Sequence, residues 1–95
     1  MNAFMIVHAT VKNMDKFKTY SELAAPTLKE FGAEIMFKGK VTAVLTGEHQ
    51  HKMSAVMKFP DNKSIKDWYD SESYQTLIPL RDSAASVVFI SVDQL

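Results

Sequence analysis

The stretch that decides the fold is residues 33–59, AEIMFKGKVTAVLTGEHQHKMSAVMKF, in the middle of the chain. Residues 33–46 are rich in apolar side chains on both sides of Gly39, which predicts one strand with a glycine break or two short strands in a bent ribbon. Residues 47–51 are predicted to form a turn, and residues 52–59 a further strand. Strands that follow each other without a helix between them predict a β-hairpin at the centre of the fold.

Upstream of this hairpin, the sequence predicts a strand followed by a helix. Residues 4–11 are rich in β-branched and apolar residues and contain no breaker, which is typical of a strand. Apolar residues then recur at helical spacing, with Asn13 as a candidate N-cap and Gly32 as the stop. Pro26 lies inside this helix and removes one hydrogen bond, which predicts a kink or a helix in two pieces.

Downstream of the hairpin, the sequence predicts a helix, a second short helix and a last strand. Asp61 or Asn62 is the expected cap of the first helix, and residues 70–71 interrupt its pattern. In the second helix, Pro79 either introduces a kink or starts a last turn. Residues 86–92 are predicted to form the final strand.

The predicted order is therefore βαββαβ. One helix between each outer pair of strands, with a hairpin in the middle, is the split βαβ pattern of a ferredoxin-like fold. This order predicts an α+β protein with an antiparallel sheet. Residues 1–95 are expected to form a single domain, because this length leaves no room for a second core.

The two helical segments of this fold can cover only one face of the sheet, so the other face needs an occupant. Its predicted residues are too apolar to suit water and too polar for a plain core, which indicates an interface. Two such sheets packed together would form a dimer around a partly polar space. The expected residues of this face are Phe4, Ile6, His8 and Thr10 in the first strand, Ser54, Val56 and Lys58 in the third, and Val87, Phe89 and Ser91 in the last.

The composition excludes several classes of function. Eleven basic residues balance eleven acidic ones, whereas nucleic-acid and membrane-surface binders usually carry a basic excess. RNA binding on an open sheet of this fold is disfavoured for the same reason. The absence of cysteine excludes disulfides and thiolate chemistry. No signal peptide and no apolar run of about 18 residues is found, so we expect a soluble, cytoplasmic protein that binds neither nucleic acid nor membrane.

Several short motifs resemble one bacterial family. They are Tyr20, Ala25-Pro26-Thr27-Leu28, Gly32, Phe59-Pro60, Trp68-Tyr69-Asp70-Ser71, Tyr74-Gln75-Thr76-Leu77 and Leu80-Arg81. On these motifs the chain is similar to domain of unknown function 1330, in the dimeric α/β-barrel superfamily of ferredoxin-like proteins. The resemblance implies a homodimer whose two sheets close into a barrel, with a ligand-sized cavity between sheet and helices. It implies no reaction. The chain departs from the family pattern at Glu34, where an arginine is common.

Four side chains are candidate ligand contacts: Tyr20, Trp68, Tyr74 and Arg81. Arg81 is the single arginine of the chain, and it suits a bidentate clamp on a carboxylate or enolate. It also suits a helix end, with its stem packed on the core. The three aromatic residues either line a cavity or fill the core.

No catalytic residue is defined by a motif, and His8 and Arg81 are the best candidates. His8 has an unperturbed pKa near neutrality, which suits a general base. His49 and His51 are spaced like metal ligands on a strand, but no third ligand follows at a characteristic spacing. We therefore expect solvated turn histidines, no metal and no cofactor.

Two functions stay open at this point. The chain is either an enzyme or binding protein for a small metabolite, aromatic or anionic, with cofactor-free proton transfer or oxygenation as the reaction class. Alternatively it is a non-catalytic dimeric module whose cavity is filled by side chains. A ligand-free interior lined by packed side chains would favour the second function.

Overall fold

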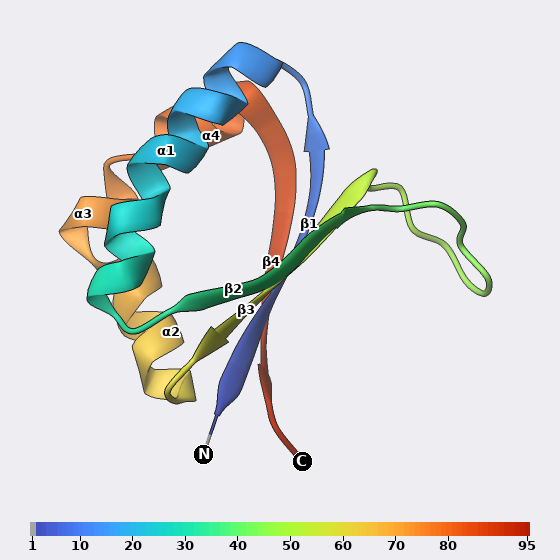
Figure 1. The fold of residues 1–95 in the computed structure, drawn as a ribbon. Coiled ribbons are helices and arrows are strands. Elements are labelled where there is room, and N and C mark those ends of the chain that lie inside the picture. The colour runs from blue at the N-terminus through green and yellow to red at the C-terminus, as the bar shows by residue number, and fades with distance from the viewer. Residues whose placement is uncertain (1) are drawn as a thin grey trace.

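The computed structural model describes residues 2–95 and has the βαββαβ order, with the second helical segment divided into three short helices (Figure 1). All three strand pairs are antiparallel, in the order β2-β3-β1-β4. The ferredoxin-like prediction is confirmed. The elements are β1 (Ala3–Val11), α1 (Met14–Glu30), β2 (Glu34–Lys40), β3 (Met53–Phe59), α2 (Asn62–Asp70), α3 (Glu72–Gln75), α4 (Ile78–Ala84) and β4 (Ala85–Asp93).

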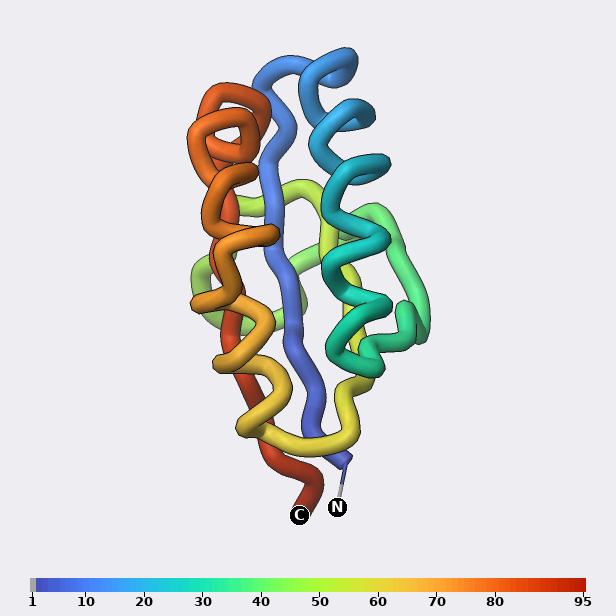
Figure 2. Tube along the Cα trace, turned by 90° about the vertical axis from the view of Figure 1, so that its left-hand side faces the viewer, coloured from blue at the N-terminus to red at the C-terminus, as the bar shows by residue number. Residues whose placement is uncertain are grey.

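All helices lie on one face of the sheet (Figure 1). In Figure 2, α1 runs beside the α2–α4 segment, and the central strand β1 is seen between them. Side chains of β1 alternate between the two faces, and those toward the helices are buried in the core. These buried positions are Ala3, Met5, Val7 and Ala9.

The helix ends follow local sequence signals. Asn13 accepts a hydrogen bond from the Lys16 amide at 3.0 Å, and Asp61 accepts one from the Ser64 amide at 2.7 Å. Gly32 follows α1 with a φ of +76°, the left-handed conformation that favours glycine after a helix. α1 continues through Pro26 as one helix, so the alternative of two pieces is wrong.

Two predicted boundaries are wrong. The sequence predicted strand up to residue 46, but β2 ends at Lys40 and residues 41–52 form a loop. Branched side chains favour a strand there, yet a strand also needs a hydrogen-bonded partner. The second short helix is two helices, α3 and α4, with Pro79 in the first turn of α4. A proline suits that position because the first amides of a helix have no partner within it.

The predicted open face is right for two strands and wrong for the last. In β1 and β3, Ile6 lies opposite Val56 on the open face. In β4, however, Ile90 lies opposite Ile6, and directly paired residues of antiparallel strands share a face. The open-face residues of β4 are therefore Val88, Ile90 and Val92, whereas Val87, Phe89 and Ser91 have the opposite orientation. A shift of one residue exchanges the faces of a strand.

Within residues 2–95, no helix has the length and apolarity needed to span a membrane. The cytoplasmic location expected from the sequence stays a prediction.

Candidate functional site

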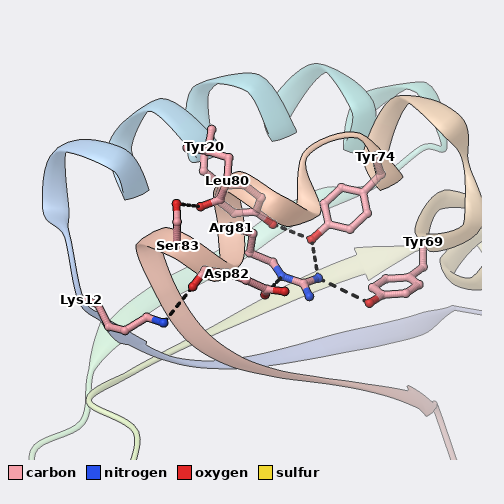
Figure 3. A network of polar contacts seen from close by, with 8 residues as sticks. All are labelled: Lys12, Tyr20, Tyr69, Tyr74, Leu80, Arg81, Asp82 and Ser83. Atoms are coloured by element: carbon pink, nitrogen blue, oxygen red, sulfur yellow. Dashed lines mark hydrogen bonds and ion pairs between the residues drawn. The ribbon is translucent and has the colours of Figure 1, made fainter.

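A network of polar side chains connects the helices above β4 (Figure 3). Arg81 of α4 donates through Nη1 to the hydroxyl of Tyr74 at 3.1 Å and to that of Tyr69 at 3.4 Å. The hydroxyls of Tyr74 and Tyr20 share a hydrogen bond of 2.7 Å. Three predicted ligand contacts, Tyr20, Tyr74 and Arg81, thus belong to one network.

Arg81 is a buried cation whose countercharge lies at the protein surface. The residue is 8% exposed, and its guanidinium carbon lies 5.4 Å from the ring centroid of Phe89, within cation–π distance. Nε donates to the Asp82 carboxylate at 3.1 Å, but the Asp82 side chain is 62% exposed. An exposed ion pair of this kind contributes little energy, so most of the buried charge is held by phenol dipoles and the Phe89 ring.

The phenols of this network stay neutral at physiological pH. Burial raises the pKa of Tyr20 far above its ordinary value, and the neighbouring Tyr74 raises it further. Burial also raises the pKa of Tyr74, although hydrogen bonds from Tyr20 and Arg81 oppose the shift. Burial alone would lower the pKa of Arg81, but its hydrogen bonds outweigh burial and raise it. The site therefore combines a permanent cation with neutral hydroxyl groups.

Arg81 opens onto a pocket of about 270 Å³ beside β4. Among the hydrogen bonds of residues 2–95, none involves Nη2 of Arg81. No fully buried side-chain nitrogen or oxygen in this part of the chain lacks a partner, so Nη2 keeps some accessible surface, and Arg81 is one of the residues that line the pocket. The pocket is lined by Met5, Ile65, Tyr69, Arg81, Val87, Phe89, Ile90 and Ser91.

A smaller cavity of about 100 Å³ lies between α1 and the sheet. Tyr20, Trp68 and Phe89 contribute to its wall, and Phe89 also lines the pocket at Arg81. Lys38 is the single charged residue among the described side chains around this cavity. The cavity therefore offers apolar surface and little hydrogen bonding.

Trp68 packs in the core and has a satisfied indole. Its ring centroid lies 4.1 Å from that of Tyr74, and its Nε1 donates to the Thr27 hydroxyl at 3.0 Å. Thr27 in turn donates to the Ala24 carbonyl at 2.6 Å. Trp68 therefore presents ring carbons, rather than a free N–H group, to the cavity.

His8 does not join this network. Its side chain lies on the open face of the sheet, where Nδ1 is 2.8 Å from the Ser54 hydroxyl, and it lines neither cavity. Its nearest aromatic neighbour is His49, with ring centroids 4.6 Å apart. Within residues 2–95, no group of three potential ligands has the arrangement needed for a metal ion.

Sequence reasoning missed three residues of the site. Tyr69 was not among the predicted ligand contacts, yet its hydroxyl accepts a hydrogen bond from Arg81. Phe89 was placed on the wrong face of β4, and Thr27 was not considered as the partner of the indole. The signal for Thr27 was a polar residue among apolar ones on the buried side of a helix, where it needs a hydrogen-bond partner.

Together these features define an α+β ferredoxin-like protein with a buried arginine–tyrosine network beside a pocket. The family model of domain of unknown function DUF1330 matches residues 2–95, and the chain belongs to this family. Among curated proteins, none matches the sequence.

Solved structures of similar fold cover nearly the whole chain. A protein of unknown function from Rhodopseudomonas palustris has a TM-score of 0.83 at 12% identity, over 99% of this chain and 82% of that one. A dimeric ferredoxin-like protein of unknown function from Jannaschia sp. CCS1 has a TM-score of 0.73 at 8% identity, over 99% and 100%. SnoaB of Streptomyces nogalater, a cofactor-independent oxygenase, has a TM-score of 0.72 at 5% identity, over 99% and 93%. At these identities the likeness shows the fold alone.

Proposed function

We propose that the protein binds a small organic anion in the pocket beside Arg81. The observation that carries this proposal is the position of Arg81, which lines a pocket of about 270 Å³ and whose Nη2 has no hydrogen-bond partner among the described residues. A guanidinium nitrogen in that position suits a carboxylate, enolate or phenolate oxygen, because charge-assisted hydrogen bonds are strong. Because Asp82 is exposed, it competes weakly for the same charge.

The pocket also defines the body of the ligand. Ile65, Val87 and Phe89 supply apolar walls, which suit a small ring or a branched chain. The volume lies just below the range of about 300–1,000 Å³ typical of ligand sites. A ligand the size of a single substituted ring therefore fits better than a nucleotide or a polyketide chain.

Binding is better supported than a particular reaction. Neither cavity has a histidine, aspartate or glutamate among its described lining residues, so a general base of these types is not at hand. Arg81 and the hydroxyl group of Tyr69 can instead stabilise a negative charge that develops on the ligand. Cofactor-free proton transfer or oxygenation of a substrate that ionises readily is the chemistry we propose to test after binding.

Calorimetric titration with a panel of small aromatic and aliphatic carboxylates tests the proposal. Arg81→Gln should weaken the best binder at least about tenfold, because a hydrogen bond to a charged group contributes about 1.5–3 kcal/mol. Lys63→Gln is the matched control, since Lys63 is an exposed cation on α2, in an ion pair with Asp67 away from both cavities. The Lys63→Gln protein should bind the same carboxylate as tightly as the wild type does.

Two results would contradict the proposal. Equal affinity in Arg81→Gln, with its fold intact by circular dichroism, would remove Arg81 from the site. Failure of every carboxylate to bind would favour the alternative of a non-catalytic module. That alternative has its own support, because every buried side-chain nitrogen and oxygen in the described chain is already hydrogen-bonded.

We further propose that the protein is a homodimer joined through the open faces of its sheets. Val88 and Ile90 are each 44% exposed and lie on this face beside Phe4 and Ile6. A run of exposed apolar side chains on one face marks an interface, and the Jannaschia protein of the same fold is described as dimeric. A second copy of this face would cover these side chains with equally apolar ones.

Sedimentation equilibrium tests the dimer. Ile90→Lys places an unpaired charge in the proposed interface and should raise the dissociation constant at least about 100-fold, since breaking a buried arrangement with a lone charge costs about 3–5 kcal/mol. Leu23→Lys is the control, because Leu23 is an apolar residue of α1 that is 49% exposed and lies on the opposite side of the sheet. A wild type that is monomeric throughout, or an Ile90→Lys protein as dimeric as the wild type, would exclude this interface.

A further inference from the structure

Three histidines gather on the open face of the sheet, away from the pocket at Arg81. His8 comes from β1, whereas His49 and His51 come from the loop formed by residues 41–52. The ring centroids of His8 and His49 are 4.6 Å apart, and those of His49 and His51 are 5.7 Å apart, both edge to face. The three imidazoles therefore form one contiguous cluster.

Hydroxyl groups of the sheet hold two of the rings. Nδ1 of His8 lies 2.8 Å from the Ser54 hydroxyl of β3. Nδ1 of His51 lies 3.0 Å from the Thr10 hydroxyl of β1. A hydroxyl can donate to an unprotonated ring nitrogen or accept from a protonated one, so these bonds fix the positions of the two rings.

The cluster attaches an otherwise exposed loop to the sheet. His49 and His51 are half-buried, whereas Glu48, Gln50 and Lys52 between and beside them are exposed. No backbone hydrogen bond joins residues 42–51 to the sheet among the bonds of the described chain, and those at the base are Val41 to Lys52 and Lys52 to Ala9. Among the hydrogen bonds of the described chain, the bond between His51 and Thr10 is therefore the one that joins residues 42–51 to the sheet, and the ring contact between His49 and His8 adds to it.

No carboxylate compensates a positive charge in this cluster. Ser54 and Val88 lie opposite His8 on the two neighbouring strands, and both are uncharged. The charged open-face residue of β3 is Lys58, farther along the strand opposite Phe4. Lys52 follows the cluster in sequence. Glu48 makes no ion pair with a histidine in the part of the chain that the structure describes.

We propose that this three-histidine cluster is a pH-sensitive latch, which holds residues 42–51 on the sheet when its imidazoles are neutral and releases them when they are protonated. Protonation places like charges less than 6 Å apart, and like charges at that distance repel. After protonation both nitrogens of a ring are donors, so the bonds with Thr10 and Ser54 persist only where the hydroxyl accepts.

The sign of the pH dependence follows from His8. Burial, and then the charges of His49 and His51, lower the pKa of His8 below its ordinary value of 6.5. When the loop is released, His8 regains that ordinary value, so the released state binds more protons as the pH falls below 6.5. Linkage therefore favours the attached loop above this pH and the released loop below it.

NMR relaxation of the whole protein tests the latch. At about pH 7.5, the backbone order parameters of residues 43–50 should approach those of rigid structure, about 0.85, and at about pH 5.5 they should fall below about 0.6. The double variant His8→Gln/His49→Gln cannot accumulate these charges and should show the same order parameters at both pH values. Lys58→Gln removes a charge from the same face outside the cluster and should keep the wild-type response.

A second readout separates the latch from general acid unfolding. The pKa of His8, measured from its imidazole proton shifts, should rise in His49→Gln, because a neighbouring charge is removed. Order parameters that do not change between the two pH values would overturn the proposal, as would a loop already flexible at neutral pH. A simultaneous loss of order in β1 and β3 would also overturn it, since the change would then be global.

Discussion

At the scale of single residues, Tyr74 holds the buried network together. Its hydroxyl bonds to Tyr20 on one side and to Arg81 on the other, and the residue is fully buried. Tyr74 therefore connects α1, α3 and α4 through one oxygen atom. Removing that oxygen leaves the buried Tyr20 hydroxyl without a partner and Nη1 of Arg81 with only its longer bond to Tyr69, a more costly change than the loss of a single hydrogen bond.

Tyr74→Phe should lower the free energy of unfolding by about 1–3 kcal/mol, the usual cost of unsatisfied buried groups. Urea denaturation measures this change. Tyr69→Phe is the matched control, because Tyr69 is half-buried and its bond to Arg81 is longer, at 3.4 Å. If both substitutions have equal effects, the hydroxyl of Tyr74 is not the centre of the network.

At the scale of elements, the turn from α1 into β2 depends on one glycine. Gly32 has a φ of +76°, and a Cβ added there would lie 2.9 Å from Cγ of Pro60. Any other residue therefore meets both backbone strain and a collision. Gly47 has a similar φ of +83°, but a Cβ added there would have nothing within 4 Å. A comparison of the two glycines therefore separates the cost of backbone strain from the cost of the collision.

Gly47→Ala should lower the free energy of unfolding by about 1 kcal/mol, the cost of a left-handed non-glycine residue. Gly32→Ala should lower the free energy of unfolding by about 1–3 kcal/mol more than Gly47→Ala does, because the collision with Pro60 adds to the backbone strain. Thermal denaturation of both variants gives the comparison. A Gly32→Ala protein as stable as Gly47→Ala would mean that Pro60 moves away freely.

Local sequence signals predicted where helices begin and end better than they predicted which strands pair with each other. Asn13, Asp61 and Gly32 act within a few residues of their own position, so the sequence was sufficient to place them. The orientation of Phe89 depends on the pairing of β4 with β1, and the sequence pattern of β4 alone does not predict that pairing. The loop after Lys40 likewise depends on the absence of a partner strand, because its branched residues alone favour a strand.

The same distinction applies to the candidate site. Tyr74 and Arg81 were both predicted ligand contacts, and the structure joins them with Tyr20 in one network through the Tyr74 hydroxyl. The sequence placed His8 on the open face of the sheet, and the structure keeps it there, away from Arg81 in the helix layer. The sequence also did not predict the three-histidine cluster, since no contact was expected for the loop that carries His49 and His51.

At the scale of the whole molecule, the sheet separates two kinds of chemistry. The helix-covered face holds a permanent cation among neutral phenols, none of which changes charge near neutral pH. The open face holds His8, an imidazole whose pKa lies below its ordinary value of 6.5 because of burial and the nearby histidines. Ligand binding and the proposed latch should therefore respond to pH in different ranges, although they lie on one sheet.

The stability of the whole molecule should fall as the pH rises above 10. In the unfolded chain Tyr20 and Tyr74 lose their protons near their ordinary pKa of 10.0, whereas the fold keeps both protonated to higher pH. The folded state then binds more protons, so the free energy of unfolding decreases by up to about 1.4 kcal/mol per pH unit for each phenol. Urea denaturation between about pH 9 and pH 11 measures the slope. Tyr20→Phe/Tyr74→Phe keeps all lysines and should show a shallower decline. Equal slopes would mean that these phenols ionise as easily in the folded protein as in the unfolded chain, which contradicts their burial.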